Sequence, residues 1–172
     1  ARIEDNKLPL DQRDEAVEDL ERLAEYGDVH AQYFLGLLYR DGGLLLPDAE
    51  QAVYWLELAA KRNLPEAQYA LGKLYLSDDP EVHDTDNGIQ WLERAAQKGN
   101  ADAAYRLGKE YLTGTSVQKN AVKAAEYLRH AADRNHPWAS YLLGKLYLTG
   151  NGIPKDEETA WNCFRMANAY GH

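Results

Sequence analysis

The stretch Ala31-Gln32-Tyr33-Phe34-Leu35-Gly36-Leu37-Leu38-Tyr39 decides the fold of this chain, because its pattern Ala-x-Tyr-x-x-Gly-x-x-Tyr recurs three more times. The other copies begin at Ala67, Ala103 and Ala139, so each copy starts 36 residues after the previous one. A fixed period of roughly 20 to 50 residues indicates a repeat protein in which each unit packs on its neighbours. The period also allows each position of the repeat to be compared between four copies of the same sequence.

The composition predicts a folded, acidic protein. Of the 172 residues, 45% are hydrophobic, which argues against disorder, and the formal net charge is −9. A negative charge disfavours general binding to nucleic acids and to anionic membrane surfaces. The sequence has no apolar run approaching the ~20 residues that a membrane helix needs, and no signal peptide is recognisable. We therefore expect neither a nucleic-acid partner nor a membrane partner.

Cys163 is the single cysteine, which excludes an internal disulfide but does not fix the redox compartment. The cytoplasm is favoured, and an exported protein whose signal has been removed is the alternative. The chain begins at Ala1 without a methionine, so upstream sequence is expected to have been removed. Residues 1–12 are polar and are expected to form a linker or a frayed N-terminus.

The Ala-to-Tyr segment of each period is predicted to be a helix, named helix A, with one buried face. On a helical wheel of ~100° per residue, Ala31, Leu35, Leu38 and Tyr39 share that face. Gly36 lies at its edge, and a glycine inside a helix costs about 1 kcal/mol relative to alanine. The equivalent glycines of the other copies are Gly72, Gly108 and Gly144. Four such glycines indicate that a neighbouring helix approaches too closely for a Cβ atom.

A second apolar stripe follows each helix A and predicts a partner, helix B, that packs against it. The stripes consist of Ala52, Val53, Leu56, Ala59 and Ala60, then Gly88, Ile89, Leu92, Ala95 and Ala96, then Ala124, Ala125, Leu128, Ala131 and Ala132. Small residues at two successive positions allow close packing of the two helices. The next apolar position carries Trp55, Trp91 and Tyr127, which are expected to fill the space between repeats.

Polar and small residues mark the ends of these helices. The predicted N-caps of helix B are Asp48, Asn120 and Asp156, with either Asp84 or Asp86 in the second repeat. Helix B is expected to end at residues that tolerate a left-handed backbone. These residues are Gly27, Asn63, Gly99, Asn135 and Gly171. Pro65 and Pro137 are expected in the first turn of the following helix A.

We predict an all-α fold, an α–α superhelix (solenoid) of antiparallel helix pairs with about nine helices and 36-residue repeats. A single repeat domain is expected at residues 13–171. Its parts are a half repeat at 13–29 and repeats at 30–65, 66–101, 102–137 and 138–171. Neither end shows the polar cap that terminal repeats normally have, so the chain is expected to be part of a longer protein. The alternative is that the last helix caps the stack.

The four copies resemble the Sel1-like repeat family, which is related to the tetratricopeptide repeats. The resemblance rests on Ala-x-Tyr-x-Leu-Gly-x-x-Tyr in helix A, a Gly-rich turn, and Ala-x-x-x-aromatic-Leu-x-x-Ala-Ala in helix B, over roughly residues 14 to 171. A 36-residue period fits this family better than the ~34 residues of tetratricopeptide repeats. The resemblance implies that A helices line a concave side, and that the protein is a non-enzymatic adaptor or scaffold, as in many bacterial members.

Two positions depart from this pattern. Glu110 takes the place of a leucine that is otherwise expected to be buried, and Cys163 replaces the aromatic residue of helix B. Trp161 lies two residues before that cysteine. The leucines equivalent to Glu110 are Leu38, Leu74 and Leu146. We expect these exchanges to alter local packing without changing the fold.

The face of helix A opposite its buried stripe is the candidate binding surface. Its recurring positions carry Tyr33, Tyr69, Tyr105 and Tyr141, followed one turn later by Leu37, Lys73, Lys109 and Lys145. Tyrosine offers flat apolar area with a hydroxyl, and lysine attracts carboxylates, so this face suits an extended peptide. Trp138 adds a candidate aromatic anchor. The alternative is that the tyrosines pack between neighbouring A helices and that the lysines are solvated.

The function expected from this surface is a protein–protein interaction scaffold with a protein or peptide partner. Two alternatives stay open: an accessory repeat domain of a larger, possibly enzymatic, bacterial protein, and weak self-association of a monomer through open solenoid ends. The loop Leu44-Leu45-Leu46 either contacts a partner or, as we favour, folds back over the helix ends.

No catalytic, metal or cofactor site is predicted. None of the five histidines pairs at i, i+4 with a helical glutamate as zinc proteases require. His130 and His136 flank a helix end, but a metal site is not expected there. Cys163 has no evident base partner and is expected to be a buried thiol.

Overall fold

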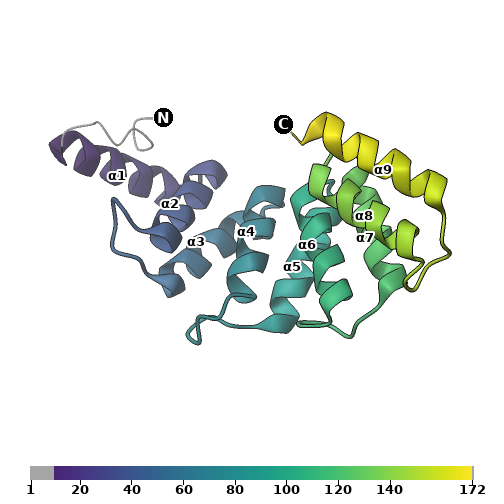
Figure 1. Cartoon of the computed structure of the whole chain (residues 1–172). Coiled ribbons are helices and arrows are strands. Elements are labelled where there is room, and N and C mark those ends of the chain that lie inside the picture. The colour runs from purple at the N-terminus through teal and green to yellow at the C-terminus, as the bar shows by residue number, and fades with distance from the viewer. Residues whose placement is uncertain (1–9, 172) are drawn as a thin grey trace. The chain divides into compact units, whose positions relative to one another are not determined.

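The computed structural model describes the backbone of residues 10–171, and burial and side-chain contacts for residues 12–171. Within this part of the chain it contains nine helices and no strand, which confirms the predicted all-α class. The described residues divide into two compact units, with the boundary between Asp84 and Thr85. In each unit, consecutive helices pack side by side and are joined by short connections (Figure 1).

The first unit contains α1 (Leu10–Glu25), α2 (Val29–Asp41), α3 (Ala49–Lys61) and α4 (Pro65–Tyr75). The second contains α5 (Thr85–Gln97), α6 (Ala101–Thr113), α7 (Ala121–Ala132), α8 (Pro137–Thr149) and α9 (Glu157–Tyr170). Helices α2, α4, α6 and α8 are the A helices of the sequence pattern, and the odd-numbered helices are the B helices. Most of the expected N-terminal linker lies outside the described residues, and α1 begins at Leu10, so residues 10–12 of that segment are helical.

One backbone hydrogen bond closes the connection between helix A and helix B in all four repeats. The residue just before helix B donates its backbone N–H to the carbonyl oxygen of the second tyrosine of the motif. In the first repeat, Asp48 donates to Tyr39 at 2.9 Å. The equivalent bonds run from Asp84 to Tyr75, from Asn120 to Tyr111 and from Asp156 to Tyr147. Asp48, Asn120 and Asp156 also accept a backbone hydrogen bond from the residue three positions later, which confirms them as N-caps. Since α5 begins at Thr85, Asp84 rather than Asp86 holds this place in the second repeat.

The ends of the B helices match the prediction at four of five positions. Gly27 (φ 100°), Asn63 (φ 67°), Gly99 (φ 91°) and Asn135 (φ 64°) all adopt a left-handed backbone. The prediction is wrong for Gly171, which has a φ of −89°. A negative φ is open to any residue, so the backbone conformation alone does not call for glycine. A Cβ atom added at Gly171 would nevertheless lie 2.6 Å from the carbonyl oxygen of Ala167, so this close approach favours glycine. Both predicted prolines lie in the first turn of a helix A, in α4 and α8.

The glycines of helix A lie where helix B approaches most closely. A Cβ atom added to Gly36 would lie 2.7 Å from Cγ of Leu56 and 3.1 Å from its backbone nitrogen. At Gly108 the same atom would lie 2.7 Å from Leu128, and at Gly144 it would lie 2.8 Å from Phe164. These distances are too short for a real contact, which confirms the predicted role of the helix A glycine in these three repeats.

The aromatic residues of helix B pack beside the core. Trp91 is buried, and Trp55 packs against a cluster formed by Leu20, Ala24, Ala31 and Leu35. The ring of Tyr127 stacks on Tyr111 with a centroid separation of 5.8 Å and an interplanar angle of 7°. Cys163, which replaces such an aromatic residue in α9, is buried, as predicted.

Tyr127 makes the stability of the second unit sensitive to alkaline pH. Burial raises the pKa of Tyr127 to about 12, and the nearby carboxylate of Glu93 adds to the effect. A tyrosine has a pKa of about 10 in an unfolded chain, so its stabilising effect is complete below that pH and is lost as pH rises toward 12. We expect the free energy of unfolding from urea titrations to fall over this window, and to fall less steeply in Tyr127→Phe. Equal slopes for both proteins would contradict this assignment.

Candidate functional site

In the first unit, the predicted face carries two tyrosines around an arginine. Lys73 Nζ lies 4.5 Å from the ring centroid of Tyr69 on α4, so the lysine lies over the tyrosine one turn before it. Burial raises the pKa of Tyr33 on α2, and the charge of Arg40 opposes that shift. Arg40 also interacts electrostatically with Tyr69. Arg40 therefore lies near enough to Tyr33 and Tyr69 to interact with both electrostatically, while Leu37 lies half-buried one turn beyond Tyr33.

Arg40 belongs to the candidate face but was not among the predicted site residues, although the helical wheel places it on the same face as Tyr33 and Leu37. Its Nε and a terminal nitrogen donate to the two carboxylate oxygens of Asp41, at 2.7 and 2.9 Å. These bonds hold the pKa of Asp41 below its usual range. The two hydrogen bonds hold the Arg40 guanidinium against the Asp41 carboxylate.

The second unit repeats the lysine–tyrosine arrangement twice. Lys109 Nζ lies 5.3 Å from the ring centroid of Tyr105 on α6, and Lys145 Nζ lies 5.6 Å from that of Tyr141 on α8. Trp138 packs edge-on against Tyr141, with ring centroids 6.5 Å apart, and 64% of its surface is exposed. All five predicted site residues of this unit therefore lie on two neighbouring A helices.

A lysine that lies over a tyrosine ring is attracted to that ring and can still bind an anion. The negative face of the ring attracts the ammonium group, which is worth about 0.5–1 kcal/mol at an exposed site. The side chains of Lys109 and Lys145 remain exposed in this arrangement. Each pair thus presents a positioned cation beside a flat apolar surface, which suits a carboxylate flanked by apolar groups.

His136 is a second residue that the sequence interpretation missed, because that interpretation considered histidines only as metal ligands. The backbone N–H of Ala139 donates to its Nδ1 at 3.2 Å, and its Nε2 lies 3.0 Å from a carboxylate oxygen of Asp102. Its ring stacks on Tyr105 with centroids 4.5 Å apart. His136 therefore caps α8 and fixes the Tyr105 ring. The capping role of His136 could have been found from its position in the repeat. Asp28 and Asn100 hold the equivalent position and cap α2 and α6 in the same way.

Two buried glutamines were also missed. The side-chain amides of Gln32 and Gln68 donate to the backbone carbonyls of Ala24 and Ala60, at 3.2 and 3.1 Å. Each glutamine follows the first alanine of the helix A motif, and each carbonyl belongs to the last turn of the preceding helix B. The two carbonyls also accept backbone hydrogen bonds from Gly27 and Asn63, at 3.1 and 3.0 Å, so each glutamine adds a further hydrogen bond at the end of helix B.

In the loop Leu44-Leu45-Leu46 of the first unit, Leu45 and Leu46 lie in different surroundings. Leu45 packs against the core cluster of Leu20, Ala24, Ala31 and Leu35, as expected for a loop that folds back. Leu46 instead exposes 87% of its surface. One isolated exposed leucine is common on protein surfaces and does not define a binding site.

The described residues contain no group of three or more histidine, cysteine or acidic side chains that could hold a metal ion. Burial raises the pKa of the Cys163 thiol, which keeps it protonated and poorly nucleophilic. Within the described part of the chain, no helix has both the length and the apolar character needed to cross a membrane.

The sequence matches the Sel1 repeat family model at residues 29–64, 65–100, 101–136 and 139–172. The chain therefore belongs to the Sel1 repeat family. This assignment confirms the α-solenoid fold class and the repeat of about 36 residues. Proteins of this family generally act in protein–protein interactions and are typically non-catalytic scaffolds.

Solved structures agree with this assignment. The chain is similar to c5321, a protective antigen of uropathogenic Escherichia coli strains with an SLR fold, at 31% identity over 95% of this chain and a TM-score of 0.86. It spans 34% of that protein's length. It is also similar to a Sel1 repeat protein from Oxalobacter formigenes, at 27% identity over 91% of this chain and 70% of that chain, with a TM-score of 0.76. No curated protein matches the sequence significantly.

Proposed function

We propose that this chain binds an extended, acidic segment of a partner protein through the exposed face of its A helices and catalyses no reaction. The observation that carries the proposal is the recurrence of one arrangement, a lysine held over the tyrosine one turn before it, on α4, α6 and α8. Because the arrangement occurs at the same repeat position in three helices, a chance placement of these lysines is a weak explanation for it. In the family that the sequence resembles, the A helices line the concave side, where a peptide has most contact area.

Charge supports an acidic partner. The chain has a net charge of −9, yet one recurring position of the A helices carries Lys73, Lys109 and Lys145, of which Lys109 and Lys145 are exposed. Lysines at recurring positions of the A helices attract carboxylates locally, while the negative charges elsewhere on the protein repel them, which favours one binding register. Trp138 and Tyr141 supply the aromatic area that dominates many peptide interfaces.

The proposal is tested by selecting phage-displayed random peptides on the intact chain. We expect the enriched peptides to be rich in Asp and Glu, and to lose binding to the double variant Lys109→Glu/Lys145→Glu. The matched control is Lys98→Glu/Lys155→Glu, which changes the net charge equally at two exposed turn residues of the same unit. Peptides without acidic enrichment, or peptides whose binding falls equally in both variants, would contradict the proposal.

A second candidate is that the array is an accessory domain of a larger protein. The observation that favours it is that the chain spans only 34% of the E. coli antigen that it resembles. The full reading frame from which this sequence comes decides between the two, since a neighbouring catalytic domain would support an accessory role.

A further inference from the structure

The two units differ in charge. Residues 1–84, which include the first unit, contain 8 lysines and arginines against 19 aspartates and glutamates. Residues 85–172, which include the second unit, contain 11 against 9. The formal net charge is therefore −11 for the first part and +2 for the second, which together give the −9 of the whole chain. Because the first part repels an acidic ligand and the second does not, charge favours the second unit as the binding site.

In the first unit, a carboxylate already lies beside the cations of the candidate face. Asp41, the last residue of α2, accepts two hydrogen bonds from Arg40, at 2.7 and 2.9 Å. These bonds lower the pKa of Asp41, and the charge of Lys73 on α4 lowers it further. Asp41 therefore lies near Lys73 as well as against Arg40, and Lys73 itself is half-buried.

The second unit has no carboxylate at the equivalent position. Two repeats later in the sequence, Thr113 takes the place of Asp41. Lys145 likewise takes the place of Lys73. The helices keep this register, because α6 ends at Thr113 as α2 ends at Asp41, and α6 and α8 contact each other directly. The position that holds a negative charge in the first unit thus holds an uncharged side chain in the second.

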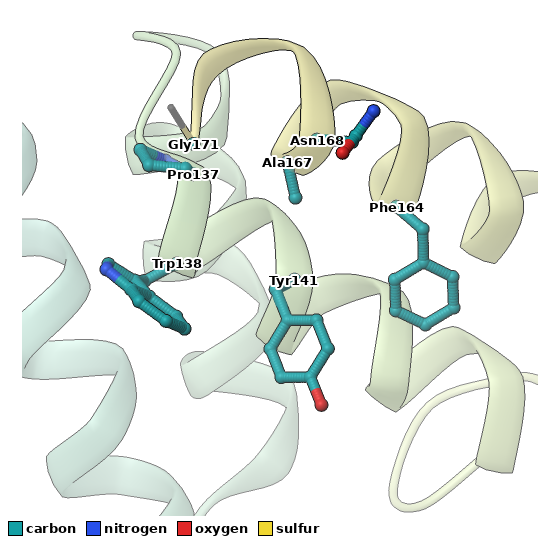
Figure 2. A pocket seen from close by; sticks show the side chains of 7 residues that line it. All are labelled: Pro137, Trp138, Tyr141, Phe164, Ala167, Asn168 and Gly171. Atoms are coloured by element: carbon teal, nitrogen blue, oxygen red, sulfur yellow. The ribbon is translucent and has the colours of Figure 1, made fainter.

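No carboxylate of the described residues forms an ion pair with Lys109 or Lys145. In the described part of this unit, the contacts between basic and acidic side chains are Arg106–Glu110, His136–Asp102 and Lys155–Glu157. Lys145 is exposed and lies over the ring of Tyr141, which projects from α8 beside Trp138 (Figure 2). Lys109 is exposed although α7 and α8 both contact α6, so exposure at this position is a property of the repeat.

We propose that the acidic partner segment binds the second unit alone, with one of its carboxylates beside Lys145 and Thr113, at the position that Asp41 fills in the first unit. Asp41 is an internal counterpart of that carboxylate, which neutralises the cations of the first unit and so excludes the ligand from them. This inference rests on the proposed function and narrows the site to α6 and α8, which carry Lys109 and Lys145.

The role of Asp41 is tested without a ligand, by following its side-chain carboxyl through a pH titration with NMR. We expect Lys73→Met to raise the pKa of Asp41, because it removes a nearby cation. Arg40→Met should raise that pKa more, because it also removes two hydrogen bonds. The control Lys61→Met removes a lysine of the same unit that pairs with Glu57, and it should leave the pKa of Asp41 unchanged. A pKa of Asp41 that Lys73→Met does not change would overturn its internal role.

The position of the ligand is tested by fluorescence anisotropy, in which a fluorescein-labelled acidic peptide from the phage selection is titrated with the intact protein. We expect Lys145→Glu to weaken binding at least about tenfold, and Lys73→Glu to change it by less than about twofold. Thr113→Asp should weaken binding at least about threefold, because it places a carboxylate where the ligand's would lie. The control Thr113→Asn has a similar shape without the charge and should bind as the unchanged protein does. Thr113 is exposed, so neither substitution disturbs the core.

Two negative results have different meanings. If no acidic peptide binds the unchanged protein, the proposed function is wrong and this inference is wrong with it. If a peptide binds, two results overturn this inference alone. They are an equal loss of affinity in Lys73→Glu and Lys145→Glu, and equal affinities of Thr113→Asp and Thr113→Asn.

Discussion

Gly36→Ala is expected to destabilise the first unit by about 1–3 kcal/mol, as overpacked core substitutions do. The expectation is unusual, because glycine to alanine inside a helix normally stabilises by about 1 kcal/mol. Here the new Cβ atom would lie 2.7 Å from Cγ of Leu56 and 3.1 Å from its backbone nitrogen. The clash involves the branch point of a fully buried leucine and the backbone of α3, so it cannot be relieved by moving the end of a flexible side chain.

The measurement is a urea denaturation series of four proteins: the unchanged chain, Gly36→Ala, Leu56→Ala and the double variant. Leu56→Ala alone should cost about 2–5 kcal/mol, because it removes a fully buried side chain. In that background Gly36→Ala should cost much less, because most of the overlapping atoms are gone. Strictly additive free energies of unfolding would show that the helix A glycine is not a packing requirement.

Glu110→Leu is expected to stabilise the second unit by about 1–4 kcal/mol, as when a buried charged group gives way to well-packed apolar residues. Only 7% of Glu110 is exposed. One carboxylate oxygen accepts a hydrogen bond from Arg106 at 2.9 Å, while the other is buried with no hydrogen-bond partner. The equivalent residues Leu74 and Leu146 show that the repeat accommodates a buried leucine here.

Two controls separate the causes of this gain. Glu110→Gln keeps the shape of the side chain and removes its charge, so it isolates the cost of burying a carboxylate. Arg106→Ala removes the partner and should destabilise, because it leaves Glu110 buried without that hydrogen bond. A lower free energy of unfolding for Glu110→Leu than for the unchanged chain would mean that the ion pair stabilises the unit more than a leucine does.

The sequence predicts the helix pairs and their contacts because those depend on register. The roles of Gly36, Gly108 and Gly144 follow from a helical wheel alone, since direction on a helix is set by residue spacing. One departure is at Leu38, which was placed on the buried face and is only half-buried. Another is Gly171, where residue type suggested a left-handed backbone that the helix end does not adopt.

The sequence predicts which candidate residues share a helix face, but it does not predict their contacts. A wheel places Tyr105 and Lys109 on one face, but only the side-chain rotamers bring the ammonium over the ring. His136 contacts Asp102 and Tyr105, residues 34 and 31 positions earlier, so its role depends on how neighbouring repeats stack. The bonds of Gln32 and Gln68 depend equally on where the preceding helix ends.

The central claim is that the lysine–tyrosine face binds an acidic segment, and calorimetric titration of a selected acidic peptide into purified protein tests it most directly. We predict that Lys109→Glu/Lys145→Glu weakens binding at least about tenfold, a loss of roughly 1.4 kcal/mol or more, and that added salt reduces the difference. The control Lys98→Glu/Lys155→Glu should bind within a factor of about two of the unchanged chain. Equal affinities for the two double variants would contradict the account.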